Sequence, residues 1–212
     1  QPAATGAKVV TRESLLRAFK DKFGEDFKLE FSPEGWLISV RGMPGNGERA
    51  GTDFKADDPR KAVARAREVI DASAALLGLQ PELPLGTPIA KGNGISAQVY
   101  FKETSDGVPL APSGNVTVDL GPQGELLAIS SDYMRDVKVV NERRLDSDQA
   151  KVKALAAVLD PSASPISLGG NPVIWAWDRE GHHAYEYNVQ GRQVVIDAAS
   201  GEVLFKRDRR RF

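Results

Sequence analysis

The chain has no cysteine among its 212 residues. Disulfide bonds, zinc sites built from thiolates and catalysis by a thiol are therefore excluded. The same absence says little about the compartment, because many bacterial secreted proteins also lack cysteine.

Histidine is nearly absent, and the two that exist, His182 and His183, are neighbours. Adjacent residues on a strand point to opposite faces, so we do not expect this pair to share a metal ion. Neither histidine belongs to a His-Glu-x-x-His pattern, in which helical spacing brings two imidazoles to one zinc. We predict that both are turn residues beside Gly181, and we predict no metal site and no cofactor.

The sequence also lacks a recognisable nucleophile. There is no Gly-x-Ser-x-Gly elbow, and the stretch Ala199-Ser200-Gly201 is typical of a hairpin turn. The acidic cluster around Asp57 and Asp58 is explained by helix capping before a proline. We therefore predict no catalytic residues and no enzymatic activity. A site assembled from residues scattered along the sequence is kept as an alternative.

No apolar run approaches the roughly 20 residues needed to cross a bilayer, and the polar stretch from Gln1 does not resemble a signal peptide. We expect a soluble chain whose signal has been removed. With 28 basic and 29 acidic residues the net charge is only −1. Bulk charge therefore favours neither a nucleic-acid partner nor a membrane partner.

Three segments carry the helical pattern. In the first, Thr11 is a candidate N-cap and Gly24 a candidate stop. In the second, Asp58 and Pro59 begin a helix that ends at Gly78. In the third, Asp146 and Gln149 resemble a capping box. The expected apolar faces are, in order, Leu15, Phe19 and Phe23; Val63, Ala66, Ile70, Ala74 and Leu77; and Val152, Leu155, Ala156 and Leu159.

Alternating apolar residues predict strands between these helices. We expect a short strand pair after the first helix, an antiparallel meander over residues 89–133 after the second, and four strands after the third. The expected bounds are 27–31, 36–40, 173–177, 184–189, 193–197 and 202–206. The order predicts an α+β fold of two small domains, residues 1–140 and 141–212, each an antiparallel sheet packed with one or more helices.

The chain ends in a strongly basic tail. Lys206 and Arg207 are followed by Arg209, Arg210, Arg211 and the terminal Phe212. A solvated terminus that protects an edge strand explains such a tail. Nucleic-acid binding would require a basic face elsewhere, and the rest of the chain is acidic in balance.

Two segments resemble known families. Residues 98–131 resemble the fungalysin/thermolysin propeptide motif, with Gly107, Val108 and Pro109 at its centre, Val116 and Val118 in the next strand, and Gly124, Glu125 and Leu126 at the turn. Residues 147–206 resemble a PepSY domain, in which a helix precedes a small antiparallel sheet. The matching residues there are Asp197, Ala198, Gly201, Val203 and Leu204.

The resemblance implies the propeptide of a secreted, thermolysin-like zinc metallopeptidase. Such a propeptide assists the folding of the peptidase domain, inhibits it, and has no catalytic residues of its own. The partner would be the cognate zinc metallopeptidase catalytic domain, and the location secreted or periplasmic. On this reading Arg209, Arg210, Arg211 and Phe212 lie in the peptidase cleft. The alternative is a free-standing secreted peptidase inhibitor or a PepSY-type binding module.

Overall fold

The structure is a computed structural model that describes residues 11–42, 49–50, 53–158 and 170–208. The chain forms two compact units that are interleaved in sequence. The first unit comprises Gln1–Gln80, Thr87–Phe101 and Asn115–Tyr133, and the second comprises Pro81–Gly86, Lys102–Gly114 and Met134–Phe212. Each unit has a largely antiparallel sheet with helices, which confirms the predicted α+β class. The domain boundary at residue 140 stays a prediction.

Two helices of the first unit begin at the predicted caps. Thr11 Oγ1 accepts a hydrogen bond from the Ser14 N–H at 3.2 Å, and Asp58 Oδ1 accepts one from the Arg60 N–H at 3.0 Å. Pro59 takes the first helical position, where a missing N–H costs nothing. The elements of this unit are α1 (Arg12–Phe23), β1 (Phe27–Phe31), β2 (Leu37–Gly42), α2 (Pro59–Leu77), β3 (Ile89–Gly92), β4 (Ala97–Lys102), β7 (Asn115–Leu120) and β8 (Leu126–Ser131).

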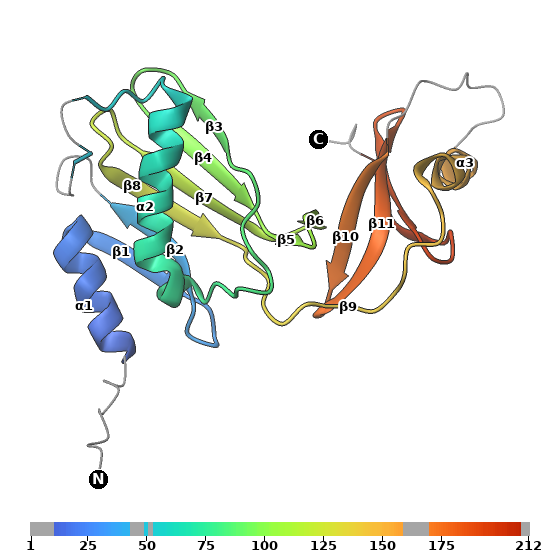
Figure 1. Cartoon of the computed structure of the whole chain (residues 1–212), viewed down its shortest axis with the longest axis horizontal. Coiled ribbons are helices and arrows are strands. Elements are labelled where there is room, and N and C mark those ends of the chain that lie inside the picture. Colours follow the sequence, from blue (N-terminus) through green and yellow to red (C-terminus); the bar gives the residue numbers. More distant parts are fainter. Residues whose placement is uncertain (1–10, 43–48, 51–52, 159–169, 209–212) are drawn as a thin grey trace, which may run out of the picture. The chain divides into compact units, whose positions relative to one another are not determined.

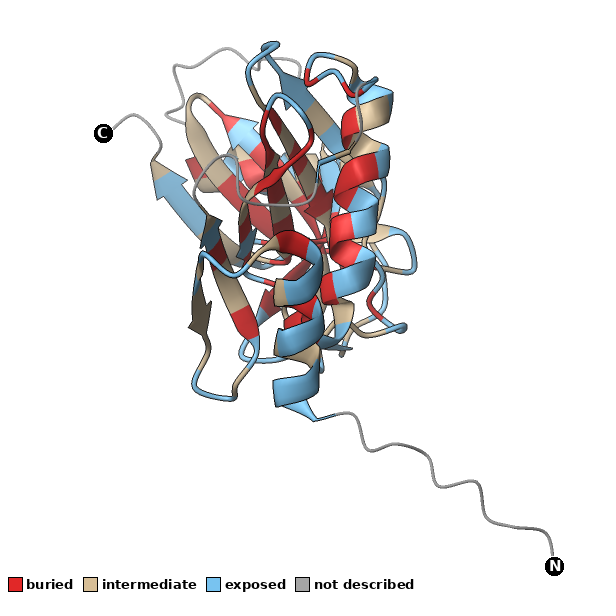
Figure 2. Ribbon diagram, turned by 90° about the vertical axis from the view of Figure 1, so that its left-hand side faces the viewer, coloured by how far each residue is buried: buried red, intermediate tan, exposed pale blue. Residues whose placement is uncertain are grey.

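The strands of the first unit form a sheet in the order β1-β2-β8-β7-β4-β3, and α2 lies along one of its faces (Figure 1). Burial alternates along the central strands, so that Val99 and Val118 are buried while Gln98 and Asp119 are not. The buried stripe of α2 faces the sheet (Figure 2). The α2 stripe includes Ala62, Ala66, Val69, Ile70, Leu76 and Leu77.

The second unit has a sheet in the order β13-β12-β11-β10-β6-β5, and a short strand, β9, pairs with β11. The elements of this unit are β5 (Thr104–Ser105), β6 (Val108–Ala111), β9 (Lys138–Val139), α3 (Ser147–Val158), β10 (Asn171–Trp177), β11 (Glu180–Val189), β12 (Arg192–Asp197) and β13 (Val203–Asp208).

Helix α3 covers one face of the second sheet, but not with the residues predicted. Its buried residues are Ala150, Ala154 and Val158, whereas Val152 is 64% exposed. The alanines let the helix approach the large rings of Tyr185 and Tyr187, which belong to the same core. The predicted face was therefore largely wrong, because Val152 and Ala156 are exposed, whereas Leu155 is partly buried against this core.

Residues 104–111 also differ from the prediction of a single meander. They form the β5–β6 hairpin, whose turn places Gly107 at a φ of +76°. Strand β6 pairs in parallel with β10, with Leu110 opposite Ile174 and Ala111 opposite Trp175. Leu110 and Ile174 are both fully buried in one cluster. This long-range apolar contact moves the hairpin out of the first sheet.

Candidate functional site

The second unit has a groove on the sheet face opposite α3. The groove has a volume of ≈ 520 Å³. We call it the aromatic groove; it is lined by Trp175, Trp177, Glu180, His182, Leu204 and Phe205. Its size lies within the range of protein ligand sites, which is roughly 300–1,000 Å³.

Strand geometry brings these side chains together. Trp175 and Trp177 are two residues apart on β10 and so share a face. In the register with β11, Trp175 lies opposite His182 and Trp177 lies opposite Glu180. Phe205 of β13 reaches the same face, and its ring centroid is 4.9 Å from that of Trp175. Three strands therefore contribute to one apolar surface with two polar groups.

The outer part of the groove exposes a large apolar side chain to solvent. Trp175 is only 6% exposed beneath Phe205, but Trp177 is 74% exposed. A contiguous apolar surface with polar groups at its rim is typical of a docking or ligand site. The groove is therefore the strongest candidate site in the described part of the chain.

The polar side of the groove is fixed by a buried carboxylate. His182 Nδ1 lies 3.0 Å from Asp197 Oδ2, and Asn141 Nδ2 donates to the same oxygen at 3.1 Å. The other oxygen of Asp197 accepts the N–H groups of Ala199 at 2.7 Å and Ser200 at 2.8 Å. Burial alone would raise the pKa of Asp197, but these hydrogen bonds together lower it.

Asp197 therefore stabilises the β12–β13 turn through hydrogen bonds and positions His182. We expect Asp197→Ala to lower the free energy of unfolding by about 2–4 kcal/mol, because several donors lose their buried acceptor at once. Urea denaturation of the two proteins measures the difference. Glu202→Ala is the matched control in the same hairpin, and it should change stability by less than about 0.5 kcal/mol because Glu202 is exposed. Equal losses would contradict this stabilising role.

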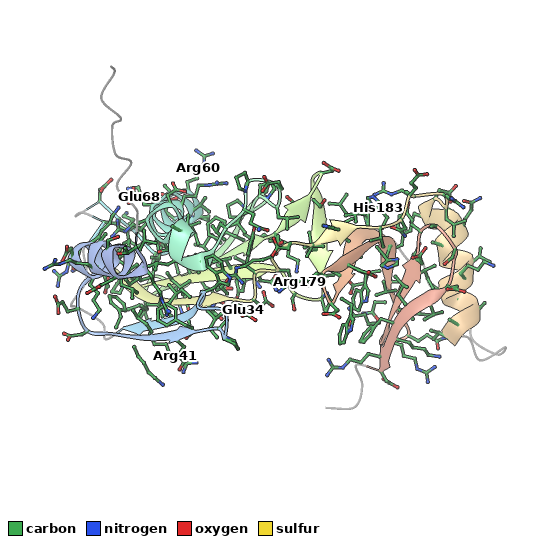
Figure 3. The ribbon with its side chains drawn as sticks, turned by 90° about the horizontal axis from the view of Figure 1, so that it is seen from below. Glu34, Arg41, Arg60, Glu68, Arg179 and His183 are labelled. Carbon is green, nitrogen blue, oxygen red and sulfur yellow. The ribbon has the colours of Figure 1, made fainter. Side chains whose placement is uncertain are left out.

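His183 points to the face of β11 opposite to that of His182. Both histidines lie within strand β11, so the prediction that they are turn residues was wrong. Figure 3 labels His183, together with Arg179 in the β10–β11 turn. The Nδ1 atom of His183 is buried without a hydrogen-bond partner among the described residues. Burial lowers the pKa of His183, Arg143 lowers it further, and Asp106 opposes them. The folded chain thus favours a neutral His183.

Stability should fall in two steps on acidification. Below its ordinary pKa of 6.5, His183 binds a proton more readily in the unfolded chain, so the folded state is weakened as the pH falls from there. Asp197 stabilises the folded chain at pH values above its ordinary pKa of 3.8. This stabilisation is lost as the pH falls through the lowered pKa that Asp197 has in the folded chain. Urea denaturation across this range, followed by tryptophan fluorescence, should show His183→Gln removing the first step and Asp197→Asn the second. Unchanged profiles would contradict the assignment.

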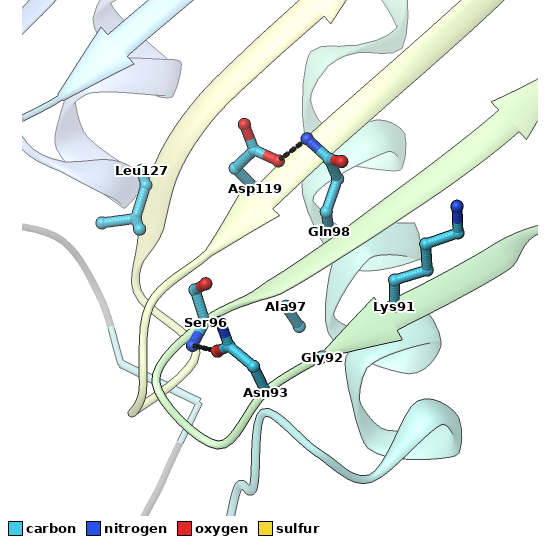
Figure 4. A pocket seen from close by; sticks show the side chains of 8 residues that line it. All are labelled: Lys91, Gly92, Asn93, Ser96, Ala97, Gln98, Asp119 and Leu127. Atoms are coloured by element: carbon cyan, nitrogen blue, oxygen red, sulfur yellow. Dashed lines mark hydrogen bonds between the residues drawn. The ribbon is translucent and has the colours of Figure 1, made fainter.

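A second hollow lies on the first sheet, and most of its lining residues are polar (Figure 4). Gln98 Nε2 donates to Asp119 Oδ1 at 2.7 Å, and Asn93 Oδ1 accepts the Ser96 N–H at 3.0 Å. These bonds pair the Gln98 and Asp119 side chains with each other and the Asn93 side chain with its own turn. The hollow is well explained as the solvated face of a half-buried sheet.

Within residues 11–42, 49–50, 53–158 and 170–208, no group of three or more His, Asp or Glu side chains is placed to hold a metal ion. His182 is paired with a carboxylate, but no described hydroxyl hydrogen-bonds its Nε2. In the same described ranges, no helix is long and apolar enough to cross a bilayer.

The predicted cleft-binding residues Arg209, Arg210, Arg211 and Phe212 lie outside the described residues. The other motif residues lie mostly at turns and in strands. Gly107, Gly124 and Gly201 have φ angles of +76°, +73° and +79°, which favour glycine. These motif residues shape the hairpins. The aromatic groove was missed, although the alternation of Trp175 and Trp177 in a predicted strand was a readable signal.

No family model matches this chain, and no curated protein matches it. Among solved structures, the Bacillus megaterium YpeB C-terminal domain is similar with a TM-score of 0.42 at 14% identity. The match covers 93% of this chain and 97% of that chain. A likeness of this size assigns no function. Membership of the propeptide family stays a prediction.

Proposed function

We propose that this chain is a non-catalytic docking module that binds a secreted zinc metallopeptidase in the manner of a propeptide. The observation that carries the proposal is the aromatic groove, in which Trp177 is 74% exposed. Exposed tryptophans in a partly apolar surface are the residues that most often dominate protein–protein binding. The sequence resemblance supplies the class of the partner.

Strand β13 offers the partner a second contact surface. It is the terminal strand of its sheet in the described part of the chain, and it contributes Leu204 and Phe205 to the groove. An edge strand can accept an added strand through main-chain hydrogen bonds. The tail, Arg209, Arg210, Arg211 and Phe212, follows β13 directly in the sequence. The module would thus dock through the groove and direct its tail into the peptidase cleft.

The test adds the purified chain to a thermolysin-like zinc peptidase from the same organism and measures hydrolysis of a peptide substrate. Dose-dependent inhibition, with recovery of activity on dilution, supports the proposal. Binding without inhibition instead supports the PepSY-type binding module, and neither binding nor inhibition rejects the peptidase as partner. Refolding yields of the peptidase with and without the chain measure the folding-assistant role.

A further inference from the structure

We infer that the aromatic groove selects an arginine side chain of its partner. The inference rests on the proposed function only in treating the groove as a docking surface. It is carried by two features: the polar groups that line the groove act as acceptors or carry negative charge, and the remaining lining is largely aromatic.

Glu180 supplies the first acceptor. It is exposed beside Trp177, its cross-strand partner, at the end of the β10–β11 hairpin. Among the described residues no basic side chain forms an ion pair with Glu180. A carboxylate next to an indole ring suits a cation that stacks on the ring while it donates hydrogen bonds.

His182 supplies the second acceptor. In the tautomer whose Nδ1 donates to Asp197, Nε2 is an acceptor. The buried charge of Asp197 lies directly behind this ring, because its Oδ2 is 3.0 Å from Nδ1. The polar groups of the groove therefore offer acceptors and negative potential, and they match a ligand that is rich in donors and positively charged.

The apolar lining favours arginine over lysine. Trp177 and Phe205 present ring surfaces, and Trp175 lies beneath Phe205. A guanidinium group is planar, stacks on aromatic faces, and carries five donors in a fixed arrangement. An ammonium group is compact and strongly hydrated, so it gains less from the same rings. A neighbouring aliphatic residue of the partner would contact Leu204.

The test measures binding of two capped pentapeptides, acetyl-Ala-Val-Arg-Val-Ala-amide and its citrulline analogue, which keeps the shape and loses the charge. A Trp36→Phe background leaves Trp175 and Trp177 as the fluorescent reporters, since the chain has three tryptophans. We expect the arginine peptide to bind at least about tenfold more tightly than the citrulline peptide. Equal affinities would overturn the inference.

Two variants assign the selectivity. Glu180→Gln should bring the arginine-to-citrulline ratio close to one, while Asp148→Asn, an exposed acid on α3 across the sheet, should leave the ratio unchanged. A ratio that survives Glu180→Gln would reject the role of this carboxylate. Binding that becomes detectable only in a chain ending at Asp208 would make the chain's own tail the occupant, and would overturn a partner arginine.

The arginine preference and the proposed function can fail independently of each other. Peptidase inhibition without any preference for the arginine peptide removes the inference and leaves the docking role. A clear arginine preference without an effect on the peptidase leaves the groove as a site and rejects the propeptide role.

Discussion

Trp177→Ala is expected to weaken binding of the zinc peptidase by about 100-fold, or close to 3 kcal/mol. Trp177 is 74% exposed, so its replacement removes a large contact surface and leaves little strain in the folded chain. The dissociation constant, measured by calorimetry with an inactivated peptidase, gives the size of the effect. The free energy of unfolding should change by less than about 1 kcal/mol.

Trp36 provides the matched control for this experiment. It is 37% exposed and lies in the first unit. Trp36→Ala should leave the dissociation constant within about twofold of the parent value, because a residue outside an interface contributes little to it. If both variants bind like the parent, the aromatic groove is not the docking surface.

Deletion of residues 209–212 is expected to reduce inhibition at least about 100-fold while binding through the groove remains measurable. The deletion removes three arginines and a terminal phenylalanine, which are the residues proposed to fill the peptidase cleft. Inhibition constants and dissociation constants measured on the same samples separate the two effects. An unchanged inhibition constant would remove the tail from the mechanism.

The shortened chain should end at Asp208. Asp208 Oδ2 lies 3.6 Å from Arg192 Nε, and Lys206 Nζ donates to the Ala157 carbonyl at 2.6 Å. A shorter chain would remove pairs between β12 and β13 and would disturb the groove as well. Replacing the three arginines by serine, with Phe212 retained, is the control that separates charge from the terminal ring.

The local signals in the sequence predicted the elements well. Thr11, Asp58 and Asp146 are the caps that hydrogen-bond the first turns of their helices, and Gln149 Oε1 accepts the Asp146 N–H as a capping box requires. The turn before Glu202 was predicted from its composition, and Gly201 has the positive φ that such a turn needs. These features depend on neighbours in sequence, which makes them readable.

Features that depend on distant contacts were not predictable in the same way. The pairing of β6 with β10 joins residues that are more than 60 positions apart. The sequence of residues 108–111 contains no local signal that predicts this pairing. The face of α3 was largely wrong for a related reason, since Ala150 and Ala154 are buried only because Tyr185 and Tyr187 occupy the facing strand. Asp197 was read as part of a motif, whereas its hydrogen bonds to Asn141 and His182 depend on tertiary structure.

Hydrogen–deuterium exchange of the chain, alone and with the inactivated peptidase, tests most directly whether the groove docks a protein. The account predicts slower exchange on binding at the amides of Val203–Asp208 and at the end of the β10–β11 hairpin, with no change in α1. Protection confined to the first unit, or no protection at saturating peptidase, would contradict it.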